Sequence, residues 1–216
     1  MANDHDHEHD HDHEHDHGHD HDHDHDHGHD ELDGQDQAEE LAEAEAAAIR
    51  RHALAQIRQY PDVALKLTAN EVTEFDDDLG RLVERMERLM HDAQGVGLAA
   101  TQLGVLRRLF LFQPDPETTH AVVNPRIVER SNETEVAEEG CLSLQGVRVP
   151  VERALTVTVE GKDPAGNDVR FELDGMGARV AQHENDHLDG VLILDRTDDD
   201  HRSEALGILR PQPVLR

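Results

Sequence analysis

The segment Gln182-His183-Glu184-Asn185-Asp186-His187 limits what this chain can be more than any other, because it sets two imidazoles four residues apart beside a carboxylate. On a helix of about 3.6 residues per turn, positions i and i+4 share one face, so His183 and His187 can bind one metal ion together. Glu184 would then lie within reach of water at that ion without being a ligand, as in H-E-x-x-H hydrolases. The alternative is a pair of core histidines hydrogen-bonded to the backbone, which the adjacent carboxylate disfavours.

The residues around this segment predict a helix. Asp174 is suited to the N-cap, and Gly190 stands where a C-terminal cap residue is expected. Val180, His183 and His187 recur between them at intervals of three and four, so the histidines should face inward. Buried imidazoles need partners, because an unpaired polar group loses its hydrogen bonds to water. A shared metal ion would satisfy both rings.

A catalytic site with two histidine ligands needs a third protein ligand. Cys141 is the single cysteine of the chain and follows a stretch, residues 128–136, that is typical of a strand, a turn and a second strand. A lone cysteine is more often a small buried apolar residue than a ligand. The preceding Gly140 and the incomplete two-histidine site favour a ligand here.

The glycine-containing segment 95–102 does not fit a phosphate-binding loop. No Lys-Ser or Lys-Thr pair follows Gly95 and Gly97, and the spacing is not that of a dinucleotide-binding turn. Such a segment can instead bring its backbone close to an extended peptide, with the amide of Gln102 as a hydrogen-bond donor.

Three motifs, in this order, resemble those of the peptide deformylase family: G-x-G-L-A-A-x-Q at 95–102, E-G-C-L-S at 139–143 and Q-H-E-x-D-H at 182–187. The resemblance extends from about Ile57 to Asp195. It implies one divalent metal ion, usually Fe²⁺ with Zn²⁺, Ni²⁺ or Co²⁺ as substitutes. The implied ligands are Cys141, His183 and His187.

The same resemblance assigns the reaction and its other groups. Glu184 would be the acid and base, and Gln102 with the backbone N–H of Leu142 would form the oxyanion hole. Val96, Gly97 and Gly140 are the expected substrate-binding residues. The substrate would be the N-formyl group on the initiator methionine of nascent polypeptides at the ribosome, released as formate. Gln145 stands where family members commonly have proline, which concerns the shape of a loop.

Hydrophobic patterning predicts an α+β fold with mixed or antiparallel sheets, packed around a central metal-binding helix that carries the HExxH motif. A helix should begin at the Asp76-Asp77-Asp78 segment and end near Gly95. The stretches typical of strands are 108–112, 121–123, 126–130, 147–151, 155–160, 169–173 and 191–194.

We expect four segments along the chain. Residues 1–37 should be a disordered tail, since thirteen histidines alternate there with acidic residues and little apolar surface can be buried. Residues 38–55 should form a helical extension rich in Ala and Glu, residues 56–200 the catalytic domain, and residues 201–216 a short C-terminal extension. The tail histidines should bind additional metal ions weakly.

A formal net charge of −29 argues against direct binding of nucleic acid or of anionic membranes. The chain has no apolar run of about 18 residues and no signal-peptide pattern at its amino terminus, so a cytoplasmic location is expected. One cysteine excludes an internal disulfide.

Two other functions are compatible with parts of the sequence. Another H-E-x-x-H metallohydrolase, such as a peptidase, would leave Cys141 and Gln102 without a role. A metal-storage or metal-delivery protein would use the tail histidines and leave the folded part inactive.

Overall fold

Side-chain alternation along one strand divides the core in two. In β2 (Leu109–Asp115), Leu109 and Leu111 belong to one apolar cluster, whereas Phe110 and Phe112 belong to another. Successive side chains of a strand point to opposite faces, so the two clusters lie on the two faces of one sheet. The computed structural model describes residues 29–115 and 117–210.

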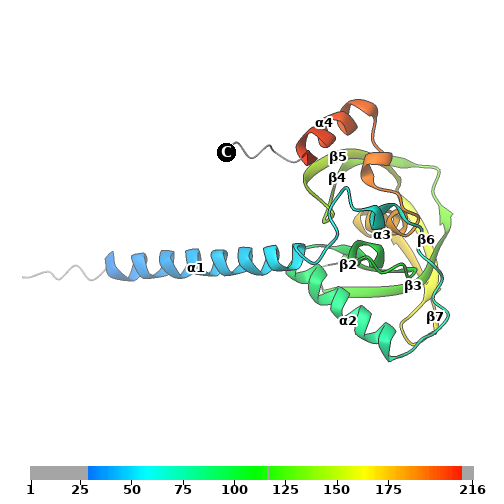
Figure 1. Cartoon of the computed structure of the whole chain (residues 1–216), viewed down its shortest axis with the longest axis horizontal. Helices are drawn as coiled ribbons and strands as arrows, with labels where there is room; N and C mark the ends of the chain where they lie inside the picture. Colours follow the sequence, from blue (N-terminus) through cyan, green and yellow to red (C-terminus); the bar gives the residue numbers. More distant parts are fainter. Residues whose placement is uncertain (1–28, 116, 211–216) are drawn as a thin grey trace, which may run out of the picture. The chain divides into compact units, whose positions relative to one another are not determined.

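The described helices are α1 (His29–Leu54), α2 (Asp77–Asp92), α3 (Gly175–Leu188) and α4 (Asp199–Leu209), with short 3-10 helices at Val63–Lys66, Ala100–Leu103 and Ile193–Asp195. The other strands are β1 (Gly97–Ala99), β3 (Thr118–Arg130), β4 (Thr134–Cys141), β5 (Leu144–Ala154), β6 (Thr156–Lys162) and β7 (Asp168–Asp174). Figure 1 shows their arrangement.

The strands form two sheets. The larger sheet has the order β1-β2-β3-β6-β7, and the smaller one pairs β4 with β5. All of these pairs are antiparallel. Met86 and Met90 of α2 pack with Leu109 and Leu111 on one face of the larger sheet. The α+β fold with antiparallel sheets is therefore confirmed.

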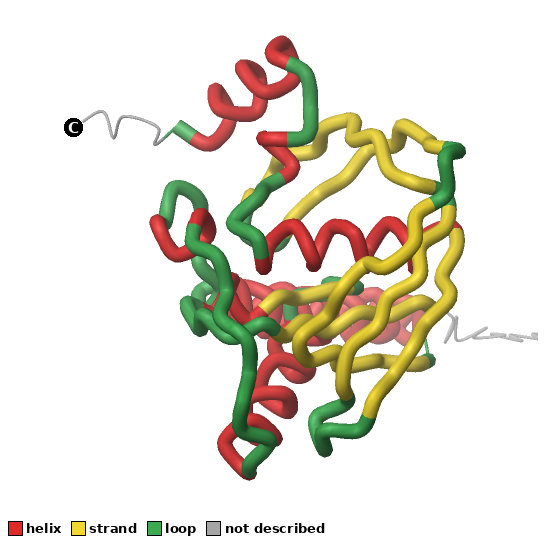
Figure 2. The backbone as a smooth tube through the Cα atoms, turned by 90° about the vertical axis from the view of Figure 1, so that its right-hand side faces the viewer, coloured by secondary structure: helices red, strands yellow, loops and turns green. Residues whose placement is uncertain are grey.

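Helix α3 lies between the two sheets (Figure 2). Ala178 and Ala181 pack with Phe110 and Phe112 on the larger sheet. On the other side, the amide of Gln182 donates to the carbonyl oxygen of Ala154 in β5 at 3.0 Å and accepts from its N–H at 3.2 Å. Contacts on both sides fix α3 in position and exclude water from most of its surface.

Helix α2 begins as predicted. The side chain of Asp76 accepts a hydrogen bond from the N–H of Leu79 at 3.0 Å, which makes it an N-cap. Asp77 and Asp78 occupy the first turn, where negative charge is favourable near the helix amino terminus.

Three of the expected strands need correction. The predicted strand at 191–194 is wrong, because Leu192 caps a 3-10 helix whose turn is closed by a bond from Leu192 N–H to Asp195. Three successive apolar side chains are buried there, so no strand alternation is present. The stretches 121–123 and 126–130 form one strand, β3, which passes through an irregular register at Asn124, where φ is 51°.

The segment boundaries also differ from the expected ones. Helix α1 begins at His29, nine residues before the predicted start at residue 38, and ends at Leu54. Helix α4 begins at Asp199, so the predicted boundary at residue 200 falls inside a helix. The predicted disorder of residues 1–28 lies outside the described residues.

Candidate metal centre

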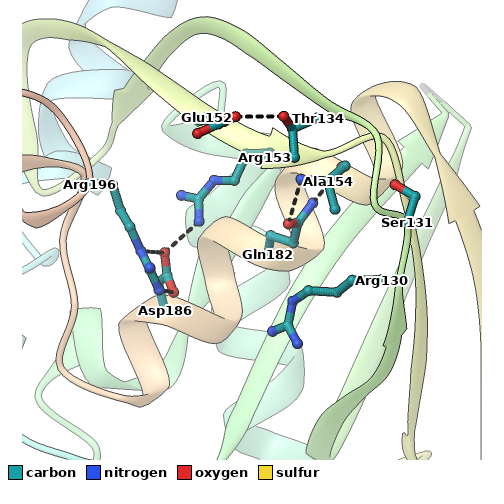
Figure 3. A pocket seen from close by; sticks show the side chains of 9 residues that line it. All are labelled: Arg130, Ser131, Thr134, Glu152, Arg153, Ala154, Gln182, Asp186 and Arg196. Carbon is teal, nitrogen blue, oxygen red and sulfur yellow. Dashed lines mark hydrogen bonds and ion pairs between the residues drawn. The ribbon is translucent and has the colours of Figure 1, made fainter.

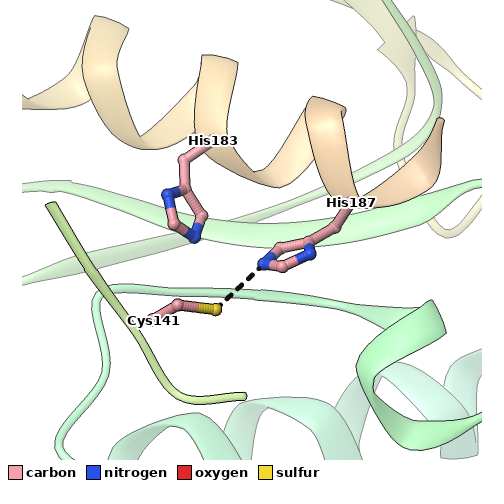
Figure 4. Close-up of side chains that lie close together, drawn as sticks. All are labelled: Cys141, His183 and His187. Atoms are coloured by element: carbon pink, nitrogen blue, oxygen red, sulfur yellow. Dashed lines mark hydrogen bonds between the residues drawn. The ribbon is translucent and has the colours of Figure 1, made fainter. Parts of the chain in front are cut away.

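Helix α3 places the two histidines of the motif side by side. The ring centroids of His183 and His187 lie 4.9 Å apart with an interplanar angle of 76°, as expected for positions i and i+4. His187 is 1 % exposed, and the helix around it is buried on nearly every side. Figure 4 shows both rings turned toward the same point.

Cys141 reaches this point from the end of β4. The hairpin between β4 and β5 pairs Cys141 with Leu144, which brings the thiol beneath α3. Its Sγ lies 3.2 Å from His187 Nε2 (Figure 4). The ligand atoms of Cys141, His183 and His187 all lie within 4.8 Å of one another. One sulfur and two ring nitrogens that converge in this way form a donor set suited to a divalent first-row metal.

Glu184 lies beside the cluster and is 4 % exposed. Its Oε2 is buried and has no hydrogen-bond partner among the described residues. A buried oxygen without a partner is costly in a purely structural site, so its presence fits a group that acts on a bound molecule. A Cβ at Gly97 would collide with Glu184 Oε1, which explains why glycine lies in β1 at this point.

Gln102 is held rigidly in the 3-10 helix after β1. Its Oε1 accepts a hydrogen bond from Ala99 N–H at 2.8 Å, and its Nε2 donates to Ser143 Oγ at 3.0 Å. The same Nε2 lies 3.7 Å from Cys141 Sγ. These contacts fix the amide so that its N–H group faces the Cys141, His183 and His187 side chains, which are called the Cys-His-His cluster below.

Leu142 lies directly after the cysteine, and its carbonyl oxygen accepts a hydrogen bond from Gln59 Nε2 at 3.0 Å. This contact fixes the peptide plane of the hairpin turn. Leu142 also lines the cavity described below.

A buried ionic network, which was not predicted from the sequence, lies behind the histidines. Glu139 accepts from His183 Nδ1 at 3.0 Å, from Arg153 through two bonds of 3.0 and 2.9 Å, and from Arg179 at 2.8 Å. A hydrogen bond to the second ring nitrogen fixes the orientation of a ligating histidine. One signal was available in the sequence, since Glu139 precedes Cys141 by two residues and strand residues i and i+2 share a face.

A second carboxylate continues this network (Figure 3). Asp186 pairs with Arg153 at 2.5 Å and with Arg196 at 2.6 Å. These residues line a cavity of about 370 Å³ on a different side of α3, together with Arg130 and Gln182. No histidine or cysteine lines it, so this cavity is separate from the Cys-His-His cluster.

Burial and neighbouring charges give the two glutamates opposite properties. Burial raises the pKa of Glu139, but hydrogen bonds from His183 and Arg153 outweigh it and lower the pKa from 4.5 to about 2. Burial raises the pKa of Glu184 from 4.5 to about 7, although the charge of His183 opposes this shift. Glu139 therefore stays ionised at neutral pH, and Glu184 can take up or release a proton there.

A cavity of about 620 Å³ opens onto the Cys-His-His cluster. The predicted site residues that line it are Val96, Gly97, Gln102, Gly140, Cys141, Leu142, His183 and Glu184. His187 is not among the lining residues and lies at the inner side of the cluster. The structure thus places eight of the nine predicted site residues at the wall of one cavity and the ninth, His187, directly behind it.

An α+β fold with a Cys-His-His cluster, a buried carboxylate and an adjoining cavity is the arrangement of a metal-dependent hydrolase. The sequence model of the polypeptide deformylase family matches residues 54–203. The chain belongs to the peptide deformylase family, whose members hydrolyse the N-formyl group of N-formylmethionyl peptides in a metal-dependent reaction.

Individual proteins similar to this chain are themselves peptide deformylases. Peptide deformylase 1 of Corynebacterium glutamicum is 42 % identical over 165 residues, which cover 73 % of this chain and 95 % of the relative. The crystal structure of peptide deformylase from Thermotoga maritima is 46 % identical with a TM-score of 0.64, and covers 66 % of this chain and 96 % of that chain. A Plasmodium falciparum peptide deformylase structure is 35 % identical with a TM-score of 0.66, and covers 71 % and 96 %.

The described part of the chain contains no helix with both the length and the apolar composition that crossing a membrane requires.

Replacing Glu139 by Gln tests the ionic network. Arg153 and Arg179 would lose their shared negative partner inside the protein, so we expect the free energy of unfolding to fall by about 3–5 kcal/mol in urea titrations. Metal affinity should fall by about 10- to 100-fold, because His183 loses a charged acceptor. Glu135→Gln is the control, since Glu135 also faces Arg179, at 3.6 Å, but is exposed. Its effect should stay below about 1 kcal/mol, and equal effects of the two substitutions would contradict the role of Glu139.

Proposed function

We propose that the Cys-His-His cluster binds one divalent ion, with Fe²⁺ as the native ion and Zn²⁺, Ni²⁺ or Co²⁺ as substitutes. The ligands are Cys141, His183 and His187. The observation that carries this proposal is the convergence of their ligand atoms within 4.8 Å beside the cavity that Glu184 and Gln102 line. A thiolate with two imidazoles suits iron as well as zinc. The central helix α3, with its HExxH motif, would then be the metal-binding helix of the fold.

Glu184 is assigned the proton transfers. When bound, the metal supplies a Lewis acid that lowers the pKa of water from about 15.7 toward 7. Glu184 accepts a proton from the attacking water and returns it to the leaving amine. The absence of a hydrogen-bond partner for its Oε2 among the described residues supports this role, because the oxygen is then available to a water at the ion.

Gln102 and Leu142 are assigned to the formyl oxygen. Negative charge develops on this oxygen as water attacks, and fixed N–H donors stabilise it. The amide of Gln102 is oriented by its bonds to Ala99 and Ser143, so it needs no rearrangement during the reaction. With the backbone N–H of Leu142 it would form an oxyanion hole, in which one donor typically contributes about 3 kcal/mol.

The peptide is expected to bind along β1. This strand is at the edge of the larger sheet, where an extended peptide can add as a further strand. Val96 and Gly97 line the cavity on this side, and Gly140 lines it from β4. Because Gly97 has no side chain, its backbone lies close to Glu184, so a peptide on β1 would bind beside this carboxylate.

We propose that the protein acts in the cytoplasm on nascent formyl-Met polypeptides at the ribosome. The net charge of −29 argues against direct binding of nucleic acid or of anionic membranes.

The histidine-rich segment supports a second, compatible role as a reservoir of weakly bound metal. Residues 1–28 contain twelve of the 19 histidines, in alternation with acidic residues. Imidazole and carboxylate together bind divalent first-row ions. Such a reservoir would supply an enzyme that needs one of these ions.

Glu184→Gln tests the proton-transfer role. An amide keeps the size of the side chain but cannot accept a proton, so formate release from a formyl-Met peptide should slow by about 10² or more. Bound metal, measured by elemental analysis after anaerobic purification, should stay at one equivalent. Glu172→Gln, the same substitution at an exposed carboxylate of β7, is the control and should keep most of the rate. Near-normal turnover of the glutamine variant would remove Glu184 from this role.

Cys141→Ala tests the ligand set in protein that lacks residues 1–28. Two imidazoles alone hold a divalent ion weakly, so dialysis against a chelator should remove the metal and the activity together. His201→Ala is the control, because His201 is an exposed histidine of α4 outside the cluster. If the alanine variant at residue 141 kept one tightly bound equivalent, Cys141 would not be a ligand.

Removing residues 1–28 tests the reservoir. Zinc or nickel titration at pH 7.5 should show that most of the metal bound beyond one equivalent is lost with this segment. At pH 5.5 the full-length protein should also lose it, since imidazole must be neutral to bind and protonates below about 6.5. Turnover of the metal-loaded truncated protein should be unchanged. Equal stoichiometry of the two forms at pH 7.5 would eliminate the reservoir.

A further inference from the structure

Residues at the end of α1 line the cavity beside the Cys-His-His cluster. The family match begins at residue 54, whereas α1 spans His29–Leu54, so almost all of this helix precedes the matched region. Arg50 and Leu54 nevertheless line the cavity. The last turn of α1 is fixed there, because Ala53 and Leu54 are buried in the apolar cluster around α2.

The side chain of Arg50 is held in place by one of its five N–H groups. Its Nε donates to the carbonyl oxygen of Ala93 at 3.2 Å. Ala93 directly precedes the segment that leads into β1, the strand along which the peptide is proposed to bind. The guanidinium is therefore positioned at the cavity wall, and its remaining N–H groups stay available.

The guanidinium of Arg50 makes no ion pair with the residues that the structure describes. Arg179 lines the same cavity, but Glu139 holds it at 2.8 Å and the Val151 carbonyl oxygen at 3.0 Å. Arg148 of β5 is a further exposed arginine of the lining. The cavity wall therefore contains two exposed arginines outside the ionic network, Arg50 and Arg148, and one exposed carboxylate, Glu138.

We propose that Arg50 is a specificity residue that binds a carboxylate in the peptide downstream of the formylmethionine, namely an Asp or Glu side chain at the second or third position. This inference rests on the proposed assignment of the cavity as the peptide site. Guanidinium groups bind carboxylates through two parallel N–H bonds, and a fixed guanidinium loses less conformational entropy on binding. The contact stabilises acidic substrates relative to neutral ones.

Long-range electrostatics act in the opposite direction. A chain with a net charge of −29 repels acidic peptides at low ionic strength, so the contact with Arg50 must be separated from the overall field. Arg51 is the control that separates the two effects. It is the next residue of α1, it is exposed, and it does not line the cavity. Its replacement removes the same charge from almost the same place.

The test uses the full-length, metal-loaded enzyme and formyl-Met peptides with an amidated carboxyl terminus, so that no terminal carboxylate is present. Glu and its neutral analogue Gln are compared at the second and at the third residue through the ratio of their kcat/KM values. The parent should favour Glu by about two- to fivefold at one of these positions, the usual size for a partly exposed ion pair. The preference should lie in KM and weaken in 0.5 M NaCl.

Arg50→Ala should bring the Glu/Gln ratio close to one, Arg50→Lys should keep part of the preference, and Arg51→Ala should keep all of it. Because each ratio compares two peptides on one enzyme, partial misfolding of a variant does not change it. A parent ratio of one at both positions, or equal losses in the two alanine variants, would overturn the proposal while hydrolysis of the Gln peptides still supports the site itself. Failure of the loaded parent to hydrolyse any of the peptides would overturn both.

Discussion

The buried carboxylate of Glu139 links the β4–β5 hairpin to helix α3, which begins more than thirty residues after Glu139 in the sequence. It lies in β4 and accepts hydrogen bonds from Arg153 of β5 and from Arg179 and His183 of α3. Burying a charge costs several kcal/mol unless it is paired and hydrogen-bonded, and here every bond also fixes a distance between elements. Because Cys141 follows Glu139 by two residues and both contact α3, the network also sets the position of the thiol relative to the histidines.

Asp186 extends this control to the other side of α3. It lies within the HExxH segment and pairs with Arg153, which also holds Glu139. One arginine thus bridges the two carboxylates, and the helix cannot rotate without separating buried charges. The two cores on either face of the larger sheet provide the stability, whereas the ionic network provides the orientation. Because the ionic network sets the orientation of α3 relative to the β4–β5 hairpin, the three proposed ligand atoms, which come from two distant segments, are held close together in the folded protein.

The local features of the fold could be predicted from the sequence, and the features that depend on pairing could not. Helix α2 follows from Asp76 as an N-cap and from apolar residues at helical spacing, because both signals act within a few residues. The apolar run at 191–194 was wrongly predicted as a strand. Its burial comes from packing against β5 and α4, which a short apolar run does not reveal. The continuity of β3 through Asn124 depends on pairing with β6 on both sides of this residue, at Val123 and at Arg126.

The sequence by itself determined the types of donor and their local spacing: two imidazoles on one helical face, a carboxylate between them, and one thiol in a glycine-containing hairpin. These follow from the period of the helix and from the chemistry of the side chains. Only the tertiary structure decided that a cysteine 46 residues from His187 meets it at 3.2 Å, and that Glu139 fixes His183. It alone brought Arg50 of α1 to the cavity wall. Such contacts depend on strand register and on the packing of distant segments, which no local pattern encodes.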